Sequence, residues 1–529
     1  MSAELLLVGT TVRTLDPARP RASAVAVTGD RIVGLDDDAL ALRGADTEVM
    51  DLGGAVTTPG LVDGHTHPVF GVTSFLGADL SACRDLDELR FALRTAALDH
   101  GHSAGDWIVG FGLDHNVFGG APLTNAVLDE VLPGRPVFIR LYDGHSALAS
   151  SEALRRAGVT GHRSFEQRAE IVCDEAGRPT GFLLEHAAMG AVQEAMPPVD
   201  AEVVHARLLE ALSGMARTGI TGTNMMDAEA GALDLLTSFE EHGELPLRLR
   251  VAPWCMPGDD VEDVLALQGR RGRRWSVEAV KFFIDGTVEG GTAWLEHADC
   301  HGQGADAFWR DPAAYTKAVQ QLAAARVQTA THAIGDAGVR HVVESLEHVE
   351  THGVRHRIEH LETMPRELVR RVVGAGLVAS MQPPHVGYTR ADHTDEWSRR
   401  LGAERAARAW VCREIRDAGG VLVLGSDWPI ADYDARAVLA YARLRRAPNT
   451  DLAPVAPEQA LTGLMALEGM TTHAAIADGS PGAGVVAVGA RADLTVFTVD
   501  PIDAPADELA DAPIRLTVSA GRVTHRAQE

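Results

Sequence analysis

The sequence predicts an α/β protein built around a TIM-like (β/α)8 barrel, joined to a β-sandwich that both ends of the chain form together. Eight apolar, strand-like runs follow one another in the middle of the chain, and similar short runs occur at both ends. About 150 residues separate the first of the eight runs from the second. We therefore divide the chain into a composite β-domain (1–57 and 485–529), a barrel (58–70 and 219–484) and an insertion (71–218).

Short strand-like runs separated by turns make up the N-terminal region, at residues 4–8, 24–27 and 31–35. The C-terminal region repeats this pattern at residues 492–497 and 514–518. Because such short strands cannot bury themselves alone, we expect the two ends to meet in one small β-domain. The rest of the chain is then inserted between them.

The runs predicted as barrel strands end near His67, Met226, Pro253, Phe283, His332, His360, Gln382 and Asp427. From the second run onward their spacing is about 22 to 49 residues, as expected for repeated strand-plus-helix units. Amphipathic segments lie between these runs and predict helices over residues 312–326, 338–350 and 401–417.

The stretch between the first two barrel strands is far too long for an ordinary loop, so it must be a structural unit. It contains a predicted helix at residues 86–100, a strand at 137–142 and a hairpin at 170–184. The insertion leaves from the end of the first strand, where a β/α barrel carries its catalytic groups. We therefore expect it to cover the substrate.

Charge and composition limit the partners of this protein. Asp and Glu number 74 against 48 Lys and Arg, a net charge of −26, which disfavours nucleic acid and anionic membranes. No apolar run reaches the roughly 18 residues of a membrane span, and the N-terminus does not read as a signal peptide. The five cysteines are odd in number and scattered, as reduced thiols are. We expect a cytoplasmic protein that acts on a small molecule, and a homodimer is compatible with this interpretation.

Six side chains at predicted strand ends carry most of the chemical information: His65, His67, Lys281, His332, His360 and Asp427. In the sequence His65-Thr66-His67 an extended backbone points both imidazoles to the same face, so they can bind one ion without a turn. The carboxyl ends of barrel strands meet at one mouth. We therefore predict a metal site there.

Lys281 and Asp427 add reactivity to this set. Lys281 is flanked by apolar residues on a predicted strand, and a buried lysine loses its proton readily. The neutral amine can capture carbon dioxide and become a carbamate that bridges two divalent ions. Asp427 can accept the proton of metal-bound water and deliver it to the leaving group. The alternative interpretation of Lys281 is a lysine that reaches solvent, and that of Asp427 is an ordinary helix N-cap.

The pattern of these six residues resembles the amidohydrolase superfamily. More narrowly, the chain resembles the YtcJ-like branch of amidohydrolase family 3, which includes N-substituted formamide deformylase. The motifs that carry this narrower resemblance are Asp143-Gly144-His145-Ser146, Gly181-Phe182-Leu183-Leu184-Glu185, Val280-Lys281-Phe282-Phe283-Ile284-Asp285-Gly286, His332-Ala333-Ile334-Gly335-Asp336, Gln382-Pro383-Pro384-His385 and Gly425-Ser426-Asp427-Trp428-Pro429.

The resemblance implies a metal-dependent hydrolase barrel with a composite β-sandwich. It also implies that His65, His67 and Asp427 hold one ion and that His332 and His360 hold another. Carboxylated Lys281 would lie between two ions, which we expect to be zinc, with manganese, iron or cobalt as alternatives. Glu185 in the insertion is the second candidate for the bridging group.

Further residues are candidates for binding the substrate. We predict that His145 and Glu185 contact it or orient its leaving group, although a buried hydrogen-bonding pair is an equal alternative. Trp294, Tyr388 and Trp428 are candidate apolar walls, although aromatic residues at such positions are as often part of the core.

These residues together predict hydrolysis of a non-peptide C–N bond of the amide or formamide type. Metal-activated hydroxide is the expected nucleophile, and Asp427 is the expected general base and acid. Deamination of a ring C–N centre is an alternative that the same barrel supports. A binding protein without catalysis is a third alternative, which the complete set of ligand-type residues disfavours.

Overall fold

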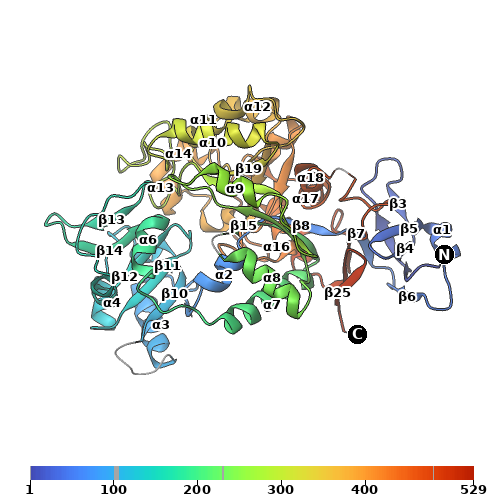
Figure 1. Cartoon of the computed structure of the whole chain (residues 1–529), viewed down its shortest axis with the longest axis horizontal. Coiled ribbons are helices and arrows are strands. Elements are labelled where there is room, and N and C mark those ends of the chain that lie inside the picture. The colour runs from blue at the N-terminus through green and yellow to red at the C-terminus, as the bar shows by residue number, and fades with distance from the viewer. Residues whose placement is uncertain (1, 100–105, 229–230, 481, 529) are drawn as a thin grey trace.

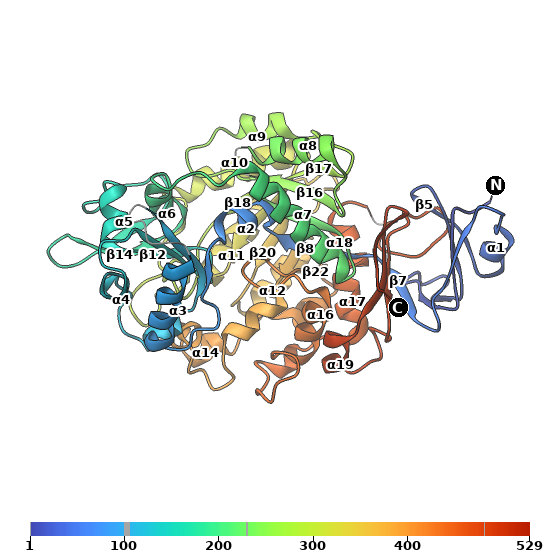
Figure 2. The ribbon, with the colours of Figure 1, turned by 90° about the horizontal axis from the view of Figure 1, so that it is seen from below.

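The computed structural model describes residues 2–99, 106–228, 231–480 and 482–528. Three regions follow one another along the longest axis of the molecule (Figure 1). The insertion lies at one end, parallel strands surrounded by helices occupy the centre, and a β-region containing both termini lies at the other end. Figure 2 shows the same order from a second direction.

Both ends of the chain contribute strands to one sheet. Its strand order is β25-β24-β23-β7-β2-β3, so N-terminal and C-terminal segments are hydrogen-bonded neighbours. A second sheet, of order β5-β4-β1-β6, packs against it through a shared apolar core. The strands of the two sheets are β1 (Leu5–Val8), β2 (Thr11–Arg13), β3 (Arg21–Ala22), β4 (Val25–Thr28), β5 (Arg31–Leu35), β6 (Glu48–Asp51), β7 (Val56–Pro59), β23 (Leu494–Phe497), β24 (Ile514–Ser519) and β25 (Arg522–Arg526).

Two sheets of parallel strands occupy the centre, with strand orders β17-β16-β15-β8 and β18-β19-β20-β21-β22. Isolated parallel bridges connect them, between Thr66 and Trp428 and between Trp254 and Lys281. The carboxyl ends of the strands therefore face one common centre. The strands are β8 (Leu61–Thr66), β15 (Ile220–Ala228), β16 (Arg248–Pro253), β17 (Trp275–Val277), β18 (Ala279–Phe283), β19 (Gln328–Ala333), β20 (Arg357–His360), β21 (Val378–Met381) and β22 (Leu422–Leu424).

Helices cover the outside of these parallel strands, as Figure 2 shows. The predicted helices over 312–326 and 338–350 correspond to α10 and α11, which end a few residues earlier than expected. The main surrounding helices are α7 (Ala201–Arg217), α8 (Ala232–His242), α9 (Val261–Leu267), α10 (Pro312–Ala324), α11 (Asp336–Leu346), α12 (Arg366–Gly374), α16 (Ala435–Leu444), α17 (Gly463–Gly469) and α18 (Thr472–Ala477). Within the described ranges, none of the helices combines the length and apolarity needed to cross a membrane.

The prediction of one continuous helix over 401–417 is wrong. One helix, α13 (Glu396–Leu401), ends where this stretch begins, and two short helices lie within it, α14 (Ala403–Ala406) and α15 (Cys412–Asp417). The indole of Trp410 is buried and stacks on that of Trp397, with the ring centroids 4.9 Å apart. Trp410 takes up a left-handed conformation, with φ of 44°, to reach this position. Burial of a large aromatic side chain outweighs continuation of the helix.

The insertion is built on a mixed sheet of strand order β13-β14-β12-β11-β10-β9 with its own apolar cores. The predicted hairpin is present as the antiparallel pair β13 and β14. The predicted helix over 86–100 corresponds to α3 (Leu86–Asp99), and residue 100 lies outside the described residues. The strands are β9 (Ala78–Asp79), β10 (Ile108–Leu113), β11 (Val137–Leu141), β12 (Ser146–Ala149), β13 (Glu170–Cys173) and β14 (Pro179–Leu184).

Candidate metal centre

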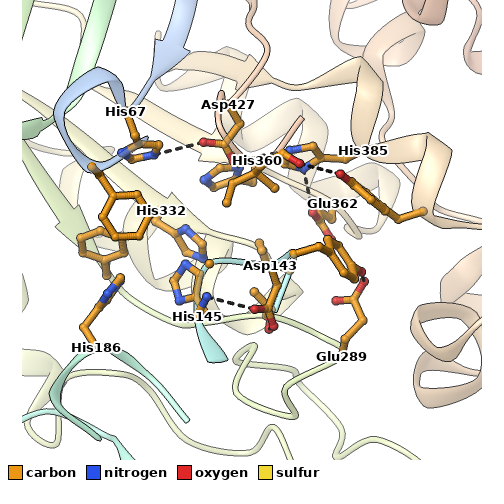
Figure 3. Close-up of a pocket in the computed structure, with 18 of the residues that line it drawn as sticks. His67, Asp143, His145, His186, Glu289, His332, His360, Glu362, His385 and Asp427 are labelled. Atoms are coloured by element: carbon orange, nitrogen blue, oxygen red, sulfur yellow. Dashed lines mark hydrogen bonds and ion pairs between the residues drawn. The ribbon is translucent and has the colours of Figure 1, made fainter. Parts of the chain in front are cut away.

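The six predicted ligand-type residues lie at the carboxyl ends of the central parallel strands. His65 is part of β8 and His67 follows it, while Lys281, His332 and His360 belong to β18, β19 and β20. Asp427 lies three residues beyond the end of β22, which is shorter than predicted. All of these side chains except that of His65 line one cavity, and Figure 3 shows His67, His332, His360 and Asp427 around it. All six side chains are buried except that of His67, which is partly exposed.

His65, His67, His360 and Asp427 form the tightest group. The Asp427 Oδ1 atom lies 3.0 Å from His67 Nε2 and 3.5 Å from His65 Nε2, and these two nitrogens are 3.2 Å apart. One donor atom from each of His65, His360 and Asp427 lies within 4.8 Å of the others. Such convergence of imidazoles and a carboxylate is typical of a divalent metal site.

Two of these residues have an unusual backbone. His360 has a φ of 77° and Asp427 a φ of 63°, both in the left-handed region that side chains other than glycine rarely adopt. The surrounding strands hold the backbone there, and this conformation turns both side chains into the cavity. Local strain of this kind is concentrated at functional sites.

Burial sets the protonation of the imidazoles. It lowers the pKa of His65 to about 4 and lowers the pKa values of His67, His332 and His360 below their ordinary value. The four rings are therefore neutral at pH 7, which is the form that binds a metal. Burial alone would raise the pKa of Asp427, but the adjacent His65 and His67 reverse this and leave it below the ordinary value. Asp427 is thus a carboxylate at pH 7.

Lys281 is completely buried, and its Nζ atom lies 3.4 Å from His65 Nε2. Burial lowers the pKa of this amine to about 8. Deprotonation near neutral pH therefore requires much less free energy than for an exposed lysine. This is the condition that carboxylation of the amine requires.

Glu359 is a buried member of the site that the sequence analysis missed. Its Oε2 atom accepts a hydrogen bond from His65 Nδ1 over 2.6 Å, and its Oε1 atom accepts one from Arg357 Nε over 2.8 Å. The carboxylate thereby fixes the His65 tautomer and leaves Nε2 available as a ligand. Arg357 and Glu359 stand two residues apart in a buried strand, and this charged pair was the signal that could have revealed them.

His385 is a second residue that the site prediction omitted. It lies in a short 3-10 helix (Pro383–Tyr388), and its Nε2 atom is 3.4 Å from Asp427 Oδ2. Its Nδ1 atom lies 3.5 Å from Glu362 Oε1. His385 therefore lies between Asp427 and the Glu362 carboxylate, and all three residues line the cavity (Figure 3).

His332 has a different environment from the other imidazoles. Its Nε2 atom lies 3.1 Å from the carbonyl oxygen of Gly286, and its ring centroid is 4.4 Å from that of His360. Asp285 lies nearby, with Oδ1 3.7 Å from the same nitrogen. The Asp285 carboxylate accepts backbone hydrogen bonds from Ile334 and Gly335 and thereby holds the turn after the His332 strand.

The candidate substrate residues are distributed unevenly around the cavity. His145 and Tyr388 line it, whereas Trp294 and Trp428 are not among the described residues that do. The Trp294 ring packs on His341, with centroids 5.3 Å apart, and the Trp428 ring packs on Tyr433 at 5.9 Å. Trp428 contributes instead through its backbone, because its carbonyl oxygen accepts the His67 N–H over 2.7 Å.

Glu185 lies in the insertion next to His145. Its Oε2 atom is 2.8 Å from His145 Nδ1, and both side chains are buried. His186 follows Glu185 and lines the cavity together with His145. Ring contacts join His145 to His332, with 4.8 Å between the centroids, so the insertion reaches the edge of the metal centre.

The arrangement of the parallel strands also occurs in a solved structure that this chain resembles. A structure described as an uncharacterized metal-dependent hydrolase from Pyrococcus horikoshii OT3 matches 95% of this chain and 99% of its own chain, with a TM-score of 0.72 and 21% sequence identity. The two proteins therefore share a fold.

The family follows from the sequence itself. Residues 48–525 match the model of the Amidohydrolase family, and the chain belongs to this family. It is 27% identical to the putative amidohydrolase YtcJ of Bacillus subtilis (strain 168), over 91% of each chain. It is 26% identical to the N-substituted formamide deformylase of Arthrobacter pascens, over 98% of this chain and 97% of that relative. The predicted family resemblance is confirmed.

Proposed function

We propose that this protein hydrolyses a C–N bond of the amide or formamide type in a small molecule. The observation that carries this proposal is the group formed by His65, His360 and Asp427, whose donor atoms lie within 4.8 Å of one another beside a cavity that His360 and Asp427 line. Similarity to an N-substituted formamide deformylase over nearly the whole chain supports the choice of bond.

The architecture behind this proposal is one (β/α)8 barrel with a composite β-sandwich and an inserted lid. Of the nine central strands named above, β17 and β18 are separated only by Glu278 and count as one barrel strand. The two isolated bridges between the parallel sheets support closure into a barrel. The shared terminal sheet supports a composite domain of residues 1–57 and 485–529. In this division the barrel comprises residues 58–70 and 219–484 and the lid comprises 71–218, but α7 (Ala201–Arg217), at the end of the latter range, packs on β15 and belongs with the helices of the barrel.

The residues at the metal centre fit a divalent ion. The buried Nδ1 atom of His360 has no hydrogen-bond partner among the described residues, and the neighbouring imidazoles are neutral at pH 7. We assign His65, His67 and Asp427 to one zinc ion and His332 and His360 to a second, with carboxylated Lys281 between them. Binding through His332 Nε2 requires this atom to give up its contact with the Gly286 carbonyl oxygen.

Ions held there supply an activated water molecule and polarise the scissile carbonyl group. Asp427 is charged at pH 7, so a carboxylate oxygen can accept the proton of the attacking water and return it to the leaving nitrogen. Glu359 keeps His65 in the orientation that this centre requires.

The cavity walls position the substrate and exclude water. Tyr388 lines the cavity, and its hydroxyl group donates to the Ile430 carbonyl oxygen over 2.5 Å, which fixes the ring. Tyr142 of the insertion stacks on this ring at a centroid distance of 4.1 Å. The insertion therefore supplies part of the substrate wall, and His145 extends this wall to the metal centre. Exclusion of water strengthens the electrostatic interactions inside.

The test combines metal analysis of the purified protein with a library of small amides, formamides and esters. We expect bound zinc and release of an amine together with a carboxylic acid or formate. Release of ammonia from cyclic substrates, with no amide cleavage, would replace this proposal with deamination. A protein that binds no divalent metal and cleaves no compound would be a binding protein.

A further inference from the structure

Three side chains of the insertion form a second group of metal-ligand type: His145, Glu185 and His186. His145 immediately precedes β12, and Glu185 lies between β14 and α6 (His186–Gln193). The antiparallel pairing of β12 and β14 aligns Ser146 with Leu184, and the Glu185 N–H donates to the His145 carbonyl oxygen over 2.7 Å. The fold thus brings together residues that are 40 positions apart in the sequence.

The donor atoms of this group lie as close together as those of the metal centre. One atom from each of the three side chains lies within 4.8 Å of the others. Two imidazoles and one carboxylate are ligands that zinc accepts. The two ring centroids are 5.0 Å apart, so the imidazoles stand next to each other.

Two polar atoms of the group are buried and have no hydrogen-bond partner among the described residues. They are Glu185 Oε1 and His186 Nε2. The Glu185 side chain is only 1% exposed, and its other oxygen is already bonded to His145. A buried carboxylate oxygen without a partner is costly in free energy, and a cation would satisfy it.

The barrel leaves room for this oxygen at Gly286. A Cβ atom at this position would lie 1.9 Å from Glu185 Oε1, so a larger residue could not be accommodated without displacing the carboxylate. Trp254 and Phe283 of the barrel pack on the His186 ring at centroid distances of 5.1 Å and 5.3 Å. The group therefore lies at the junction of the insertion and the barrel.

From this geometry we propose that His145, Glu185 and His186 bind a divalent cation that is separate from the metal centre. His332 stands between the two groups, with its ring 4.8 Å from that of His145 and 4.4 Å from that of His360. The cation would take the place of the proton between His145 Nδ1 and Glu185 Oε2, and this proton would leave to solvent. His145 would keep its Nε2–H group as a donor to substrate.

This inference does not depend on the reaction that the protein catalyses. Its consequence is that the lid carries an ion of its own, which stabilises the turn between β14 and α6 where the insertion meets the barrel.

The test measures zinc per chain in the full-length protein after dialysis against zinc, together with anomalous diffraction at the zinc edge. We expect an anomalous peak among His145, Glu185 and His186. The double variant Glu185→Gln/His186→Gln should lose this peak and one zinc per chain while keeping the zinc at His65 and Asp427. The double variant His65→Gln/Asp427→Asn should show the converse loss.

His205→Gln is the matched control, because its Nε2 atom is also buried without a hydrogen-bond partner but its ring stacks on Phe239, outside both groups. It should retain every zinc ion. The wild-type anomalous map needs no variant, so the proposal remains testable if the double variant fails to fold. No peak at the three residues would overturn the proposal, and so would unchanged zinc content in the folded Glu185→Gln/His186→Gln variant.

Discussion

The Nδ1 atom of His65 lies 2.6 Å from the Oε2 atom of Glu359, and both side chains are completely excluded from solvent. Burial alone would raise the pKa of Glu359, but Arg357 and His65 reverse this and leave it below the ordinary value. The carboxylate is therefore charged, and it holds the imidazole with Nε2 directed to Lys281 and Asp427. A metal centre that depends on His65 thus depends equally on Glu359.

Replacement of Glu359 by glutamine should weaken metal binding. The amide can still accept a hydrogen bond from His65 Nδ1 but carries no charge, so the basicity of Nε2 falls. Loss of such a supporting carboxylate typically lowers metal affinity about 10- to 100-fold. Competition with a chelator of known affinity measures the change. Glu347→Gln, which alters a partly exposed ion pair with Arg371, is the control and should leave zinc affinity unchanged.

Replacement of Asp427 by asparagine should abolish turnover while leaving the protein folded. The variant keeps the shape of the side chain but removes the proton acceptor, and loss of such a group costs about 100- to 10,000-fold in rate. Steady-state kinetics with any confirmed substrate gives kcat, and Asp432→Asn serves as a nearby control. A near-normal kcat in Asp427→Asn would refute the assignment of Asp427 as general base.

Lys281 is one of only two lysines in the chain, the other being Lys317 on α10. Lys281→Met keeps a buried unbranched side chain but cannot be carboxylated, so the variant should hold no more than one ion at the metal centre. Lys317→Met is the matched control and should hold the same ions as the wild type. Elemental analysis measures the number of ions per chain in both variants, and electron density shows the side chain at position 281. Full metal occupancy at the centre in Lys281→Met would exclude a bridging role.

The burial of His356 predicts how the free energy of unfolding depends on pH. Its ring is completely buried, and Nδ1 accepts the Thr329 N–H over 3.2 Å. Burial lowers the pKa of His356 to about 4, whereas an unfolded histidine has a pKa of about 6.5. As the pH falls, His356 therefore binds a proton in the unfolded chain before it does so in the folded chain. The contribution of His356 to stability is complete above about pH 6.5 and is lost as the pH falls toward 4.

His356→Gln should consequently flatten the fall in the free energy of unfolding across this pH range, by up to about 1.4 kcal/mol per pH unit. Denaturant titrations at pH 7, 6 and 5 measure the slope. His348→Gln, at a side chain that is 90% exposed, is the control and should leave the slope as in the wild type. An unchanged slope in His356→Gln would show that this ring is not protonated on unfolding.

The sequence reveals ligand-type residues well when they end a strand. His65, His332 and His360 all follow apolar runs, and the ends of parallel strands must share one edge, so their convergence could be predicted. Asp427 was predicted at a strand end although β22 stops three residues earlier, at Leu424. The Asp427 N–H donates to the His65 carbonyl oxygen over 2.8 Å, which holds the residue beside the metal centre.

Residues that act through another side chain were harder to predict. Glu359 contacts His65 across 294 positions of sequence, and His385 contacts Asp427 from a short 3-10 helix. Local patterns in the sequence do not indicate contacts between residues so far apart. The division of the predicted helix over 401–417 has a similar cause, because the stacking of Trp410 on Trp397 is a tertiary contact that local helix propensity does not contain.

The sheet shared by both ends of the chain has a consequence for biosynthesis. Strand β7 leads directly into β8, which carries His65, and its two neighbours in the sheet are β2 and β23, where Phe497 of β23 pairs with Val56. A ribosome must therefore add more than 400 residues after β7 before β23 exists. Nascent chains would wait with β7 paired to β2 on one side only, and a chain released before residue 494 would leave the other edge of this strand open.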